Sequence, residues 1–133
     1  MRVVLDTNVL VSGLLTRDGT CALLLDYVTE GILTVCIDDR ILGEYDRVCL
    51  SPRLNLDAAL VNDFLRFLRE SAEPFVAAPI ATQLPDPDDL PFLDVAAAAE
   101  ATLTSGNTRH YPEKCRGGVR LCTPAELLAL LRQ

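Results

Sequence analysis

The chain has 133 residues and a mass of 14.5 kDa; half of its residues are apolar and 23% are charged. This size and balance exclude a disordered chain and favour a single domain over residues 1–133, large enough to bury a core without disulfide bonds. The net charge of −7 argues against binding nucleic acid through bulk positive charge. It leaves open an enzyme that contacts phosphates through metal ions.

The sequence also favours a soluble protein of the cytoplasm, with no membrane partner. No apolar run approaches the roughly 20 residues that cross a membrane. An acid at position 6 interrupts the N-terminal apolar segment before it reaches signal-peptide length. The cysteines at positions 21, 36, 49, 115 and 122 are odd in number and form no C-x-x-C pair. We therefore expect neither a disulfide framework nor a zinc site.

The first half of the chain alternates short apolar runs with segments of helical periodicity. In chain order it is predicted to contain a strand at 3–5, a helix at 21–29, a strand at 33–37, a helix at 41–49 and a helix at 57–70. Asp38 and Asp39 are expected to cap the helix at 41–49, and Ser51-Pro52 to end it.

The second half continues the same alternation. It is predicted to contain a strand at 75–76, a loop at 79–91, a helix at 92–101, a strand centred on 103, a strand at 119–122 and a helix at 125–131. Strands that alternate with helices predict a three-layer α/β/α fold around a central parallel sheet. Functional sites in such folds form beyond the carboxyl ends of the strands.

Polar residues follow the predicted strands at these carboxyl ends. Asp6 follows the first strand, and Glu44 lies one to two turns into the helix after the second. The segment 86–89 precedes an alanine-rich helix, and Asn107 follows the next strand. Crowded carboxylates raise one another's pKa unless a cation lies among them, and Mg²⁺ and Mn²⁺ prefer such oxygen ligands. A pair of these ions can promote phosphodiester hydrolysis.

Within the segment 86–89, Asp86, Asp88 and Asp89 all remain candidate ligands, and at least one of them is expected to cap the helix. We favour Asp89, because it lies on the first helical turn, where the helix N-terminus favours its ionised form. Asp94 is an additional candidate. Five residues of helix rotate its side chain by about 140° from that of Asp89, so the two do not share a face.

Taken in order, these motifs resemble the PIN domain family. The resemblance rests on Asp6-Thr7-Asn8 after an apolar strand, on Glu44, on residues 86–93 before an alanine-rich helix, on residues 104–112 and on residues 123–128. It covers essentially the whole chain and is strongest to a bacterial branch described as toxin components of toxin–antitoxin pairs. Each motif alone is weak, whereas the ordered set is specific.

The resemblance implies a ribonuclease that depends on Mg²⁺ or Mn²⁺ and takes RNA as its substrate. Asp6, Glu44 and Asp89 match the family's metal-binding acids, and Asn8 matches a polar residue that orients the first acid or a phosphate. Asn107 falls where many members have a fourth acid and where this branch often has asparagine. Because an amide oxygen carries no charge, the number of bound ions stays open between one and two.

Two of the polar side chains have an alternative interpretation. Without the resemblance, Glu44 would be a solvated helix residue paired with Arg40 or Arg47. His110, the only histidine, is either a catalytic group at the edge of the site or a loop residue packed beside Tyr111.

A short basic stretch is the best candidate for contact with RNA phosphates. It holds four of the 12 basic residues, Arg109, Lys114, Arg116 and Arg120, and a single acid, Glu113. The alternative is a solvated surface loop. We assign substrate contact to Arg109, Lys114 and Arg116.

The sequence therefore favours a metal-dependent endoribonuclease of the toxin type, with an antitoxin and a second copy of the chain as expected protein partners. Phe64 and Phe67 lie on partly different faces of the helix at 57–70, which favours such a contact. The alternative is a PIN-like protein that binds RNA or a partner with little or no cleavage. A receiver-like phosphatase is disfavoured, because Asn8 replaces the second acid of an Asp-x-Asp pair and the only lysine, Lys114, lies in the basic stretch.

Overall fold

A computed structural model describes all residues, 1–133, and confirms the parallel sheet at its centre. The strands are β1 (Arg2–Leu5), β2 (Thr34–Ile37), β3 (Glu73–Pro74), β4 (Thr102–Thr104) and β5 (Leu121–Cys122). They lie in the order β3-β2-β1-β4-β5, and every neighbouring pair is parallel. The carboxyl ends of β1 and β4, where Leu5 pairs with Thr104, are therefore adjacent at one edge of the sheet.

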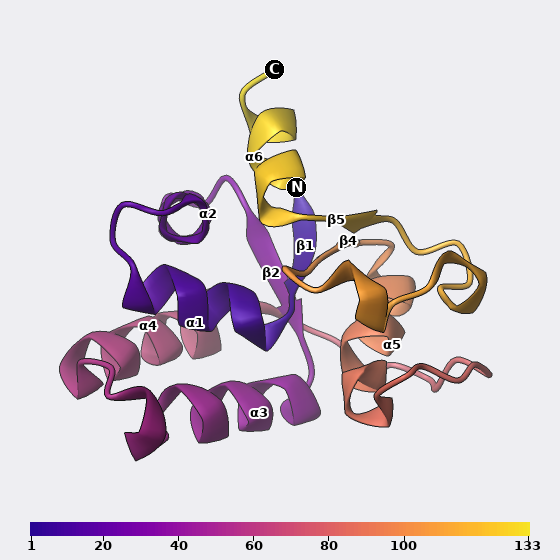
Figure 1. Cartoon of the computed structure of the whole chain (residues 1–133), viewed down its shortest axis with the longest axis horizontal. Coiled ribbons are helices and arrows are strands. Elements are labelled where there is room, and N and C mark those ends of the chain that lie inside the picture. Colours follow the sequence, from indigo (N-terminus) through magenta and orange to yellow (C-terminus); the bar gives the residue numbers. More distant parts are fainter.

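Six helices surround this sheet (Figure 1). They are α1 (Thr7–Leu15), α2 (Thr20–Thr29), α3 (Asp39–Cys49), α4 (Ala58–Ser71), α5 (Leu90–Ala99) and α6 (Pro124–Leu131). In Figure 1, α1, α2 and α4 lie on one side of the strands and α5 on the other, while α3 contacts α1, α4 and α5. The expected α/β architecture is confirmed. None of these helices has the length and apolar character of a membrane span.

The structure departs from the predicted elements most clearly in one additional helix and one displaced strand. Helix α1 was not expected, since its sequence TNVLVSGLL mixes β-branched residues with glycine and has weak intrinsic helix propensity. It forms because Val9 and Leu10 are fully buried against the core. Strand β3 lies at residues 73–74 rather than 75–76, because Cys36 and Ile37 of β2 pair with Glu73 and Pro74.

The central strand fixes the position of the next helix. Val3, Val4 and Leu5 of β1 are completely buried, as expected for a strand covered on both faces. The hydroxyl of Tyr45 on α3 donates to the backbone oxygen of Leu5 at 2.5 Å. This bond joins the middle of α3 to the carboxyl end of β1, and it sets the place of Glu44, the residue before Tyr45.

Asp94 on α5 is a buried carboxylate with a structural task. One oxygen accepts the backbone N–H of Ile80 at 2.9 Å, and the other pairs with Arg40 of α3 at 3.2 Å. Arg40 also pairs with Asp38, the residue that caps α3. Asp94 thus joins α5, α3 and the loop before η2 (a 3₁₀ turn at Pro87–Asp89), and these contacts use both of its oxygens.

Asp94→Ala should lower the free energy of unfolding by about 2 kcal/mol, because it leaves the Ile80 amide and the Arg40 guanidinium without their acceptor. Urea denaturation followed by circular dichroism measures the change. Asp63→Ala is the matched control, since its ion pair with Arg66 is solvent-exposed and should be worth less than about 0.5 kcal/mol. Equal losses in the two variants would contradict the structural role of Asp94.

Candidate functional site

Asp6 occupies the junction between β1 and α1. It is the N-cap residue of α1, yet its side chain makes no capping bond. Instead its buried carboxylate accepts two hydroxyls at one oxygen, Oδ2: Ser105 Oγ at 2.8 Å and the Tyr111 hydroxyl at 3.0 Å. Two neutral donors from the segment after β4 therefore hold this carboxylate in place.

Ser105 links the two strand ends. Its fully buried hydroxyl, besides donating to Asp6, accepts the side-chain N–H of Asn8 at 3.3 Å and the backbone N–H of Asn107 at 3.0 Å. The Asn8 side-chain oxygen accepts the backbone N–H of Gly106 at 3.0 Å. The turn after β4 is thereby attached to the first turn of α1, and Asn8 acts as a clamp between them.

Glu44 reaches the same region from α3. One of its carboxylate oxygens accepts the hydroxyl of Thr7, the residue after Asp6. The other lies 3.8 Å from Arg47, at the long limit of an ion pair. Arg40 pairs with Asp38 and not with Glu44. Glu44 is therefore turned toward the start of α1, and its pairing with Arg47 is loose.

The three aspartates before α5 have different surroundings. Asp86 caps η2, since one of its oxygens accepts the backbone N–H of Asp88 at 2.9 Å. Asp88 is exposed and its carboxylate makes no contact within the protein. Asp89 is buried and makes no capping bond. Among the three, Asp89 combines burial with a carboxylate that faces the residues after β4.

His110 lies between Asp89 and Asn107. Its Nδ1 is 2.8 Å from Asp89 Oδ2, and its Nε2 is 2.8 Å from the side-chain nitrogen of Asn107. The imidazole therefore connects Asp89 to the side chain of Asn107. Asn107 contacts this ring rather than any of the acids.

Burial and repulsion act together on Asp89. They raise its pKa from 3.8 to about 6, first because burial penalises the charged form and next because Asp6 lies nearby; Asp86 adds to the shift and His110 opposes it. The helix N-terminus, which we expected to favour ionised Asp89, does not outweigh burial and the negative charge of Asp6. The expected repulsion between crowded carboxylates is confirmed for this residue.

Three of the acids act on Tyr111. Its hydroxyl donates to Asp6, and burial raises its pKa most, while the negative charges of Asp6, Asp89 and Glu44 raise it further. Negative charges from three separate segments thus converge on one phenol. Oxygen donors of this kind suit Mg²⁺ or Mn²⁺, and a divalent cation would offset the charge that raises the pKa of Asp89.

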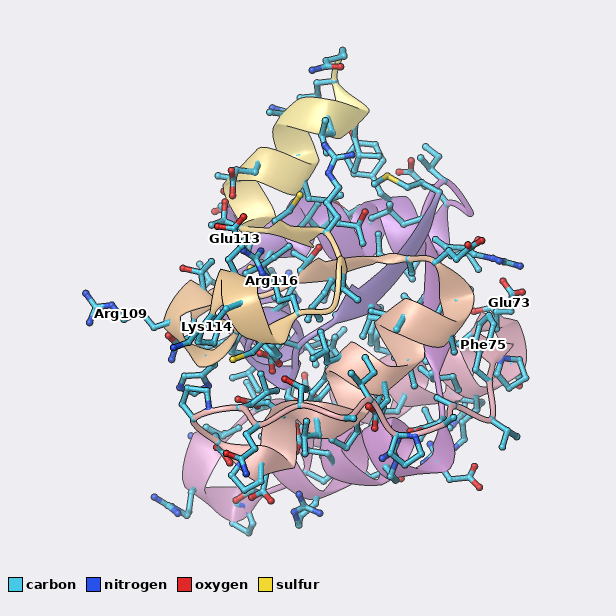
Figure 2. The ribbon with its side chains drawn as sticks, turned by 90° about the vertical axis from the view of Figure 1, so that its right-hand side faces the viewer. Glu73, Phe75, Arg109, Glu113, Lys114 and Arg116 are labelled. Atoms are coloured by element: carbon cyan, nitrogen blue, oxygen red, sulfur yellow. The ribbon has the colours of Figure 1, made fainter.

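Other predicted residues lie outside this convergence. Both oxygens of Asp94 are engaged by Arg40 and Ile80, so Asp94 is not available to it. Arg109, Lys114 and Arg116 lie on one side of the molecule in Figure 2, where Arg109 projects away from the body. None of these three basic side chains forms an ion pair within the chain.

The sequence did not reveal the roles of Thr7, Ser105 and Tyr111. Each is a hydroxyl that bonds to a carboxylate of the site. One signal was available for two of them, because Ser105 directly follows the last residue of β4 and Thr7 lies two residues after the last residue of β1, at the same sheet edge. Nothing in the sequence distinguished Tyr111 from a core aromatic residue.

Comparison with known proteins places this geometry in context. The chain is 30% identical over 110 residues to the uncharacterised protein MJ1680 of Methanocaldococcus jannaschii, covering 80% of this chain and 71% of that protein. The fold is similar to VapBC2 of Rickettsia felis, solved bound to a DNA fragment from their promoter, with a TM-score of 0.62 and 17% identity over 92% of this chain and 98% of that one.

A domain of a functionally unknown protein from Methanocaldococcus jannaschii has a similar fold, with a TM-score of 0.55 and 16% identity, covering 92% of this chain and 89% of that domain's chain. These two structural likenesses concern the fold alone. The model of the PIN domain matches residues 2–109, a span that begins at β1 and contains Asp6, Glu44, Asp89 and Asn107. The chain therefore belongs to the PIN domain family.

Proposed function

We propose that this protein is an endoribonuclease of the toxin type, dependent on Mg²⁺ or Mn²⁺. The observation that carries the proposal is the set of hydrogen bonds that hold Asp6 and Glu44 beside the carboxyl end of β1, together with the buried Asp89 that contacts His110 after β4. Domains of this family are generally nucleases. The alternative, a PIN-like binding protein without cleavage, would not need Asp6 and Glu44 held at one sheet edge by dedicated hydroxyl groups.

In this proposal Asp6, Glu44 and Asp89 hold the metal. Bound there, a divalent cation would activate water and offset the charge that develops on the scissile phosphate. The chain's own contribution is orientation: Ser105 and Tyr111 fix one oxygen of Asp6, and Thr7 fixes one oxygen of Glu44. Each of these two carboxylates keeps a second oxygen for the ion.

The basic stretch complements the acidic centre. Arg109 directly precedes His110, and Lys114 and Arg116 follow it within six residues; Figure 2 shows the three on the same side of the molecule. Their charges are free for RNA phosphates because they form no internal ion pair. A chain of net charge −7 can then bind a polyanion locally without a basic face over its whole surface.

A toxin-type role includes an antitoxin, which we propose as the protein partner in the cytoplasm. A groove of about 370 Å³ between α1, α2 and α4 has an apolar wall that includes Leu14, Leu25 and Leu60. Phe64 of α4 is buried at this groove, whereas Phe67 is half-buried on another face. We therefore propose that an apolar segment of the antitoxin binds in this groove, and not across a surface formed by both Phe64 and Phe67. A homodimer remains a separate proposal for the same helix.

Asp6→Asn should reduce metal-dependent RNA cleavage at least about a hundredfold, because it removes a charged ligand while keeping acceptors for Ser105 and Tyr111. Cleavage of a mixed RNA pool with Mg²⁺ or Mn²⁺ measures the effect. Asp88→Asn is the control of equal charge change, and its exposed carboxylate should be dispensable. Full activity in Asp6→Asn would refute the mechanism.

Asp89→Asn should stabilise the metal-free protein relative to wild type, and this stabilisation should be larger at pH 8 than at pH 5. The raised pKa of Asp89 means that its favourable contribution is complete below about pH 4 and is lost as the pH rises through about 6. The free energy of unfolding of wild type minus that of Asp89→Asn should therefore fall by about 1 kcal/mol between pH 5 and pH 8, because part of the loss has already occurred at pH 5 and solvent screens the carboxylate.

Urea denaturation in a chelator measures this difference, with Asp88→Asn as the reference. Saturating Mn²⁺ should reverse the ranking by stabilising wild type more than Asp89→Asn. If the difference in the free energy of unfolding between wild type and Asp89→Asn stays constant with pH, then Asp89 is not held in a repulsive environment.

The double substitution Lys114→Gln with Arg116→Gln should weaken RNA binding by about tenfold or more at low salt and reduce the dependence of binding on salt concentration. The measurement is fluorescence anisotropy in the Asp6→Asn background, where RNA stays intact. Arg132→Gln is the control, since it follows α6 at the opposite end of the molecule from the carboxyl ends of the strands (Figure 1). An equal effect of all these substitutions would indicate general charge loss and no local RNA contact.

A further inference from the structure

A second group of metal-capable atoms lies beside the three acids of the proposed nuclease site. Asp86, Asp89 and His110 each present one ligand atom, and these atoms all lie within 4.8 Å of one another. They come from two segments, η2 and the turn that follows β4. Only Asp89 is shared with the Asp6 and Glu44 group. The histidine gives this second group a nitrogen donor that the first group lacks.

The distances suit ligands of one ion. His110 Nδ1 and Asp89 Oδ2 are 2.8 Å apart. Adjacent ligands of an octahedral cation with bonds of about 2.1 Å lie about 3 Å from each other, close to this separation. One oxygen of Asp86 caps η2, while its other oxygen makes no hydrogen bond within the protein. Each of the three side chains can therefore offer a donor atom without breaking the local fold.

The far side of the imidazole is also held, as it is in metal sites. A histidine that binds metal through one ring nitrogen usually has its other nitrogen fixed by a hydrogen-bonding partner. Here the side chain of Asn107 contacts His110 Nε2 at 2.8 Å, and its backbone N–H is held by Ser105 Oγ at 3.0 Å. An amide can present either its nitrogen or its oxygen, so Asn107 can accept Nε2–H when Nδ1 binds an ion.

We propose that Asp86, Asp89 and His110 form a second divalent-metal site that prefers Mn²⁺ to Mg²⁺. The preference follows from the nitrogen ligand, because imidazole suits transition metals whereas Mg²⁺ takes oxygen ligands. Asn107 is then a positioning residue for His110 and not itself a ligand. The inference rests on the proposed nuclease only through the shared Asp89, and its test measures metal binding independently of cleavage.

The only histidine in the chain makes the test direct. Protein labelled with ¹⁵N-histidine and prepared without a polyhistidine tag gives ring-nitrogen resonances from His110 alone. Zn²⁺, a diamagnetic probe, should shift the Nδ1 resonance strongly and in a saturable way, whereas Mg²⁺ at the same concentration should cause only the smaller shift of an ion bound to Asp89 without the imidazole. Asp86→Asn should weaken the Zn²⁺ response by about tenfold or more, and Asp88→Asn, its exposed neighbour, should not.

Mn²⁺ binding measured by electron paramagnetic resonance gives a second, independent readout. Wild type should bind more Mn²⁺ than His110→Gln, which keeps a polar side chain of similar length but should lose about ten- to a hundredfold in affinity at this site. Asn107→Ala should weaken the same site without abolishing it. An unmoved Nδ1 resonance with Zn²⁺, or wild-type Mn²⁺ binding by His110→Gln, would overturn the proposal.

The RNA cleavage assay separates this proposal from the nuclease. If the protein cleaves RNA but Zn²⁺ does not shift its Nδ1 resonance, the nuclease proposal is supported and the second metal site is refuted. A Zn²⁺-dependent Nδ1 shift in a protein that cleaves no RNA would sustain the site and refute the nuclease. Asp6→Asn should retain the Nδ1 shift, because Asp6 is not among the proposed ligands.

Discussion

Negative charge concentrated at the carboxyl ends of β1 and β4 is the constraint to which the surrounding structure responds. Asp6, Glu44 and Asp89 arrive there from separate elements, and two of them are held by hydroxyl groups. Neutral hydrogen bonds fix the carboxylates but cannot cancel their charge. The remaining repulsion appears in Asp89, whose pKa rises to about 6. The divalent cation that we propose would offset this repulsion, and it would account for donors that hold in place a cluster that is unfavourable without metal.

The sequence could predict this arrangement because a parallel sheet brings strand ends together by construction. Asp6 after β1 and Asn107 after β4 needed only the strand assignments and the rule for where α/β sites form. Glu44 needed one more step, the phase of α3 relative to the sheet, which the Tyr45 bond to Leu5 settles in the structure. Helix α1 was missed because burial of Val9 and Leu10, and not local propensity, makes it helical.

The roles of single side chains depended on contacts between segments far apart in the chain. Ser105 meets Asp6 across 99 positions, and Asp94 meets Arg40 across 54. No local pattern encodes such a pairing. The sequence therefore placed Ser105 in a motif but did not predict its hydrogen bond to Asp6. For the same reason, the sequence could not decide which of the three aspartates between positions 86 and 89 is the ligand. Burial of Asp89 and exposure of Asp88 distinguish them only once the fold places His110 nearby.

The structure offers a physical reason for asparagine, and not an acid, at position 107. A carboxylate there would add negative charge near Asp89. The pKa of Asp89 is already raised by its burial and by Asp6. Asn107 instead holds His110, and His110 lowers the pKa of Asp89 while bringing a donor atom of its own. The pair therefore exchanges one charged oxygen ligand for a neutral nitrogen ligand. A site built this way repels itself less when empty, and it selects its metal by donor chemistry rather than by charge alone.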